Sequence, residues 1–117
     1  MPVKIRLIAT DIDGTLIRDS TPDLYPEIVE EIRRLTDGGV LFACASGRQY
    51  ASIRNVFRDV ADRILYIAEN GAHIRYRNED LSLTPMKPDD VRELIETLRG
   101  IENCEMVVST PDDLGLS

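Results

Sequence analysis

The chain has 117 residues, of which 43% are hydrophobic and 30% are charged, a composition that suits one small domain or part of one. Its 14 basic and 21 acidic residues give a net charge of −7 without any basic run, so we expect neither a nucleic-acid nor a membrane partner. The N-terminal residues contain no long apolar stretch, and we expect a cytoplasmic protein. Cys44 and Cys104 lack metal-ligand spacing, and we expect both to be buried, reduced thiols.

Three short apolar runs alternate with two amphipathic segments over residues 5–71. The runs cover residues 5–10, 40–45 and 64–68, and each ends at a turn or at small and polar residues, as is typical of buried strands. Apolar residues recur at helical spacing between them: Leu24, Ile28, Ile32 and Leu35 in a segment that starts near Thr21-Pro22, then Tyr50, Ile53, Phe57 and Val60. The alternation predicts a parallel α/β sheet with crossover helices, because parallel neighbours need long connections.

The pattern changes after residue 71. Residues 72–76 and 81–84 flank Asn78-Glu79-Asp80 and predict a hairpin. Pro88 then begins a predicted amphipathic helix, and residues 104–109 predict one more strand. We therefore divide the chain into a core over residues 1–80 and the beginning of a second unit over residues 81–117.

The loop Asp11-Ile12-Asp13-Gly14-Thr15 directly follows the first predicted strand. Two aspartates at positions i and i+2 can project toward the same edge, where one carboxylate can attack a phosphoryl group and the other can shuttle the proton. Carboxylate oxygens are also suitable ligands for Mg²⁺, which reduces the repulsion between an anionic nucleophile and an anionic substrate. Gly14 permits a tight turn whose amides can hold phosphate oxygens, and Thr15 adds a hydroxyl group.

Three segments resemble the haloacid dehalogenase superfamily of phosphatases. Asp11-Ile12-Asp13-Gly14-Thr15-Leu16 resembles its first motif, and Ala45-Ser46-Gly47-Arg48 resembles the second motif of its Cof-type branch. Glu69-Asn70-Gly71-Ala72 is similar to the end of the third strand in that branch. The resemblance covers residues 1 to roughly 72. It implies a partial Rossmann-like parallel three-layer sandwich over residues 1–80, followed by an incomplete α+β cap over residues 81–117.

The resemblance also implies roles for individual residues. Asp11 would be the nucleophile and Asp13 the general acid/base, and both would bind Mg²⁺, Asp11 through its side chain and Asp13 through its backbone carbonyl. The residues that would bind the phosphoryl group or line the cleft are Gly14, Thr15, Ser46, Gly47, Arg48 and Asn70. Three of these have simpler alternatives: Ser46 as a helix-capping serine, Arg48 as a partner of nearby acids, and Asn70 as an ordinary turn residue.

The chain departs from the family pattern in two respects. It lacks the lysine of a third motif, since Lys4 and Lys87 are badly placed, and it lacks the later acidic motif that completes the Mg²⁺ site. We therefore expect the first half of a longer enzyme, with an exposed apolar sheet edge that favours self-association.

The expected function is Mg²⁺-dependent hydrolysis of phosphate monoesters of small metabolites, with sugar phosphates as the first class, through an aspartyl-phosphate intermediate. One alternative is a phosphomutase, and another is a truncated or degenerate relative that folds or associates without turnover. A phosphorylated receiver module is disfavoured, because such modules place their aspartate on a later strand.

Overall fold

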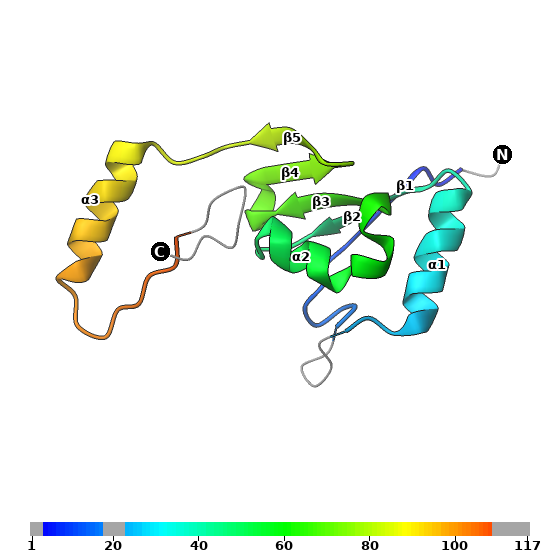
Figure 1. Cartoon of the computed structure of the whole chain (residues 1–117), viewed down its shortest axis with the longest axis horizontal. Coiled ribbons are helices and arrows are strands. Elements are labelled where there is room, and N and C mark those ends of the chain that lie inside the picture. The colour runs from blue at the N-terminus through cyan, green and yellow to red at the C-terminus, as the bar shows by residue number, and fades with distance from the viewer. Residues whose placement is uncertain (1–3, 18–22, 109–117) are drawn as a thin grey trace.

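A computed structural model describes residues 4–17 and 23–108 of the protein. A five-stranded sheet with the strand order β1-β2-β3-β4-β5 forms its centre (Figure 1). The strands are β1 (Leu7–Thr10), β2 (Leu41–Ala45), β3 (Ile64–Ala68), β4 (His73–Tyr76) and β5 (Glu79–Leu83). The first three strands are parallel, whereas β4 and β5 are antiparallel to their neighbours. The predicted α/β class is confirmed, and so is the predicted hairpin.

The helices are α1 (Pro26–Asp37), α2 (Tyr50–Val56) and α3 (Pro88–Arg99), with short 3₁₀ helices at Arg58–Arg63 (η1) and Glu69–Gly71 (η2). Helix α1 begins at Pro26, later than the sequence pattern suggested, because proline fits the first helical turn; residues 18–22 lie outside the described residues. The helix predicted across residues 50–60 ends at Val56, and Val60 has φ −134°, outside helical geometry. Val60 is nevertheless buried, as its place in the apolar pattern suggested.

The core lies between the sheet and the helices α1 and α2. On β3, Ile64, Tyr66 and Ala68 are buried, and the ring of Tyr66 meets that of Tyr50 on α2 edge to face at 5.0 Å between centroids. Leu65 and Ile67 point to the opposite face of the sheet and are only half-buried. One face of the sheet is thus well covered, and the other is partly open.

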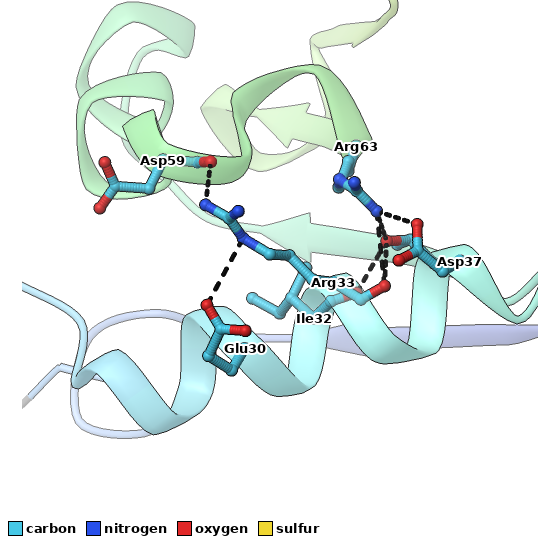
Figure 2. A network of polar contacts seen from close by, with 7 residues as sticks. Glu30, Ile32, Arg33, Asp37, Asp59 and Arg63 are labelled. Atoms are coloured by element: carbon cyan, nitrogen blue, oxygen red, sulfur yellow. Dashed lines mark hydrogen bonds and ion pairs between the residues drawn. The ribbon is translucent and has the colours of Figure 1, made fainter.

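Helix α1 is fastened to η1 by two arginines (Figure 2). Arg33 donates a hydrogen bond to the carbonyl oxygen of Asp59 at 3.0 Å, and Arg63 donates to the carboxylate of Asp37 at 2.5 Å and to the hydroxyl of Thr36 at 3.0 Å. Ile32, on the same helix, is 1% exposed and belongs to the core. These polar contacts therefore lie at the edge of the surface through which α1 packs on the protein, and the centre of that surface is apolar.

Helix α3 lies away from the sheet (Figure 1). Helix α3 begins at Pro88, as predicted, but has no buried residue. Residues 104–108 contain no strand, so the last predicted strand is wrong over this range. No strand among the described residues pairs with this segment, and Val107 is 78% exposed. Cys104 is exposed as well, which corrects the expectation that both thiols are buried.

The predicted division between residues 80 and 81 falls within β5 (Glu79–Leu83), which continues the sheet of the core. The assignment of residues 81–117 to a separate unit remains a prediction. Residues 109–117, which include Ser109 of the last predicted strand, lie outside the described residues.

Candidate active site

The loops after β1, β2 and β3 meet at one edge of the sheet. The parallel register pairs Thr10 with Cys44 and Ala45 with Ile67, so all three strands end at a similar height. Ligands of open α/β sheets bind at this edge, beyond the carboxyl ends of the strands. The predicted site residues all lie in these three loops.

Asp11 is the first residue after β1 and is exposed. Its Oδ1 atom accepts a hydrogen bond of 2.8 Å from the amide of Ile12, which fixes the orientation of the carboxylate. Oδ2 receives no hydrogen bond from residues 4–17 or 23–108. A carboxylate oriented through one oxygen, with the other available, is suited to nucleophilic attack.

The turn after Asp11 is closed by its own backbone. The carbonyl oxygen of Ile12 accepts hydrogen bonds from the amides of Thr15, Leu16 and Ile17, and the amide of Gly14 donates to Ile17. Gly14 has φ +80°, a conformation that favours glycine. These four amides are therefore engaged within the turn, and the expectation that they hold phosphate oxygens remains a prediction. A phosphate-binding role for Thr15 would have to come from its exposed hydroxyl group and remains a prediction.

Asp13 forms an ion pair with Arg48. The Nε atom of Arg48 donates to Oδ2 of Asp13 at 3.0 Å, and Nη2 donates to Oδ1 at 2.6 Å. These hydrogen bonds lower the pKa of Asp13 below its usual range; desolvation opposes the shift, and the positive charge of Arg48 adds to it. Of the two alternatives left open for Arg48, the structure shows the one in which it pairs with a nearby acid.

The second and third loops support one another. The Oγ atom of Ser46, a residue 9% exposed, accepts a hydrogen bond from the amide of Arg48 at 3.0 Å, and its hydroxyl proton can still be donated to a ligand. The amide of Asn70 donates to the carbonyl of Ser46, and the side chain of Asn70 lies next to Gly47. Asn70 has φ +57°, as expected of a turn residue, so both roles considered for it remain compatible with its position.

Two residues beside the site were not identified from the sequence. Ser52 on α2 accepts a hydrogen bond from Nη1 of Arg48 at 3.3 Å; their i, i+4 spacing on the chain could have suggested it. Cys44, fully buried in β2, lies below the loops; burial raises its pKa to about 12, and the charges of Asp11 and Asp13 add to the effect. Its thiol is therefore an inert part of the core beneath the site.

The donors available for Mg²⁺ are few but of the right kind. The carboxylate of Asp11 and the backbone carbonyl of Asp13 are hard oxygen donors, which Mg²⁺ prefers. Within residues 4–17 and 23–108, no three acidic, histidine or cysteine side chains cluster to hold a metal. Mg²⁺ ordinarily keeps several waters and shares substrate phosphate oxygens, so this pair of donors fits part of such a site.

The fold is that of an α/β protein whose candidate site lies in three loops at the carboxyl ends of parallel strands. Residues 8–116 match the haloacid dehalogenase-like hydrolase family, and the chain belongs to this family. The resemblance seen in the sequence, including that to the Cof-type branch, is confirmed.

Curated relatives and solved structures agree with this assignment. The chain is 28% identical over 96 residues to the 5-amino-6-(5-phospho-D-ribitylamino)uracil phosphatase YbjI of Escherichia coli, covering 82% of this chain and 35% of the relative. It is 33% identical over 76 residues to the phosphoglycolate phosphatase of Sulfolobus acidocaldarius, covering 64% and 34%. A crystal structure from Eubacterium rectale superposes with a TM-score of 0.73 at 39% identity, covering 81% of this chain and 36% of that one.

The chain spans 34% to 43% of the length of the curated relatives that it matches. Within the part of the chain that the structure describes, no helix has the length and apolar character that a bilayer span requires.

Proposed function

We propose that the protein hydrolyses phosphate monoesters of small metabolites with the help of Mg²⁺, with Asp11 as nucleophile and Asp13 as general acid/base. The observation that carries the proposal is the arrangement at the end of β1, where one oxygen of Asp11 is anchored and the other is available. The amide of Gly47 also has no acceptor within the described residues, so it can bind a phosphoryl oxygen together with the Ser46 hydroxyl.

The reaction would proceed in two displacements. Oδ2 of Asp11 attacks phosphorus and forms an acyl phosphate, while the bond to the leaving oxygen breaks and Asp13 gives that oxygen a proton. Water then attacks phosphorus, Asp13 takes up its proton, and the bond to Asp11 breaks to release inorganic phosphate. When bound, Mg²⁺ would supply positive charge that reduces the repulsion between Asp11 and the phosphoryl group.

The names of the relatives support small phosphorylated metabolites as substrates. One relative is named a phosphatase of a phosphorylated ribitylaminouracil and another a phosphoglycolate phosphatase. These two compounds share little beyond the phosphate ester. The proposed substrate class is therefore phosphate monoesters in general, and sugar phosphates are the first class to test. A phosphomutase begins with the same acyl phosphate and remains the alternative reaction.

Hydrolysis of para-nitrophenyl phosphate tests the proposal directly. With Mg²⁺, we expect turnover that falls by at least about a thousandfold in Asp11→Asn, because the amide cannot act as nucleophile, and that EDTA abolishes. Glu27→Gln, on the exposed first turn of α1, is the matched control and should keep full activity. Activity that survives in Asp11→Asn would disprove the nucleophile; a folded, inactive wild-type chain would favour the alternative of a relative without turnover.

Self-association through β1 and a cytoplasmic location belong to the same proposal. Strand β1 pairs only with β2 within the described residues, and Leu7 on it is 53% exposed. Cys44 and Cys104 are both free thiols, which suits a reducing compartment.

A further inference from the structure

The ion pair between Arg48 and Asp13 joins the loop after β1 to the loop after β2. Both carboxylate oxygens of Asp13 accept a hydrogen bond from the guanidinium group, at 3.0 Å and 2.6 Å. A third donor, Nη1 of Arg48, reaches Ser52 on α2 at 3.3 Å. The guanidinium group therefore lies between the first loop and α2, at the edge where the site residues meet.

This pairing conflicts with the role proposed for Asp13. A carboxyl group that delivers a proton to a leaving oxygen must carry that proton on one oxygen and bring it within hydrogen-bond reach of the leaving group. In the structure both oxygens of Asp13 are occupied by a cationic donor. While it is closed, the pair therefore opposes proton transfer by Asp13 to a leaving oxygen.

The structure permits the pair to open without disturbing the backbone. The side chains of Arg48 and Asp13 are 33% and 58% exposed, and exposed ion pairs are held only weakly. The backbone of Arg48 is fixed, because its amide donates to Ser46 at 3.0 Å and its carbonyl accepts from the amide of Glu69 at 2.9 Å. Only the side chain has to change its partner.

A phosphoryl group is a suitable second partner for the same guanidinium fork. Arginine binds two oxygens of a phosphate in the same parallel manner as two oxygens of a carboxylate. Arg48 follows Ser46 and Gly47, which are the groups proposed to bind the phosphoryl oxygens. A phosphoryl dianion at that position would compete with Asp13 for Arg48.

We propose that Arg48 exchanges partners during the reaction, an inference that rests on the proposed function. In the substrate-free protein it holds Asp13, and on substrate binding it moves to a non-bridging oxygen of the phosphoryl group. The exchange releases Asp13 at the moment when its proton transfer is required. Arg48 thereby couples substrate binding to the availability of the acid/base residue.

Binding of inorganic phosphate with Mg²⁺, measured by calorimetry, tests the exchange in four proteins: wild type, Arg48→Gln, Asp13→Asn and the double variant. We expect Arg48→Gln to weaken binding about tenfold or more, because two charge-assisted hydrogen bonds are lost. Asp13→Asn should tighten binding at least about threefold, since Arg48 no longer has a competing carboxylate. The double variant should show no such gain and should bind as weakly as Arg48→Gln alone.

Arg54→Gln is the matched control, because Arg54 lies on α2 and pairs with Asp62 at 3.5 Å, away from the site loops. It should bind phosphate like the wild type. If Arg48→Gln does not fold, as judged by circular dichroism, Arg48→Lys replaces it; this variant keeps the charge but not the fork and should bind with intermediate affinity.

Several results would overturn the exchange. Unchanged phosphate affinity in Arg48→Gln would show that Arg48 does not reach the phosphoryl group. An equal gain from Asp13→Asn in the Arg48→Gln background would assign the gain to lost charge repulsion instead of a freed arginine. A wild-type protein that does not bind phosphate at all would also exclude it. The proposed function is judged separately, by the loss of hydrolysis in Asp11→Asn.

Discussion

At the scale of single residues, a polar contact outside the site joins the buried His73 to Asp80. His73 is 1% exposed, and its Nε2 atom lies 2.7 Å from Oδ1 of Asp80, which also accepts from Arg75 at 3.3 Å. The hydrogen bond from His73 lowers the pKa of Asp80, with Arg75 adding to the shift. The Asp80 carboxylate therefore links β5 to β4 through side-chain contacts, in addition to the backbone pairing of the two strands.

Replacing Asp80 should destabilise the protein in a pH-dependent way. Asp80→Ala leaves a buried ring nitrogen of His73 without its partner, and we expect a loss of about 1–3 kcal/mol at pH 7 by urea unfolding. Because the folded-state pKa of Asp80 is depressed, its contribution is present above the unfolded value of about 3.9 and is lost as the pH falls through the folded value. The difference between wild type and variant should therefore shrink below about pH 4.

Asp89→Ala is the control for this prediction, since the Asp89 side chain is 96% exposed and its ion pair with Arg92 measures 3.8 Å. It should change the free energy of unfolding by less than about 0.5 kcal/mol. An Asp80→Ala effect as small as that of the control would mean that His73 finds another partner.

At the scale of elements, α1 and α3 differ in what supports them. Each has 12 residues and a proline in its first turn, and both have a clear apolar face. Helix α1 buries Ile32 and is held to η1 by Arg33 and Arg63 (Figure 2), whereas α3 buries no residue. Helical stability in proteins comes mostly from packing of the apolar face, so equal local patterns should give unequal stability.

Amide hydrogen exchange should separate the two helices. We expect the central amides of α3 to exchange at least about a hundredfold faster than those of α1, because local opening of α3 exposes little additional apolar surface. The matched length of the helices makes each the control for the other, and the measurement is mass spectrometry after digestion. Equal protection of α1 and α3 would show that the apolar face of α3 is covered in solution.

At the scale of the whole molecule, the sheet ends at β1 with its outer edge unpaired by the described residues. Leu7 is 53% exposed on this strand, and Ile5 just before it is 62% exposed. An open edge with apolar side chains is a template for pairing with another chain. The apolar face of α3, where Leu94 is 47% exposed, is a second candidate surface.

Sedimentation velocity with two matched substitutions distinguishes these surfaces. We expect the wild-type chain to associate as its concentration is raised, and Leu7→Lys to remain monomeric at about tenfold higher concentration, because charge on an edge strand opposes pairing. Leu94→Lys, at a residue of similar exposure, should associate like the wild type. Association that Leu94→Lys abolishes instead would assign it to α3.

The local pattern of the sequence determined most of the elements, and it carries the proposed class of site. Apolar runs that end at turns predicted β1, β2 and β3, and the paired acids of Asp11-Ile12-Asp13 predicted the chemistry, because a strand end and a tight turn are decided by neighbouring residues. The strand predicted at residues 104–109 is wrong over residues 104–108, since β propensity forms a strand only where a partner strand is available.

Only the tertiary structure decided which groups are joined across the loops. Asp13 and Arg48 are 35 positions apart, and the sequence left the partner of Arg48 open between substrate and acid until the register of β1 and β2 brought them together. The sequence also did not predict the hydrogen bonds of the turn amides within the turn or the exposure of Cys104. Such contacts depend on distances between segments far apart in the chain, which composition and spacing along the sequence do not contain.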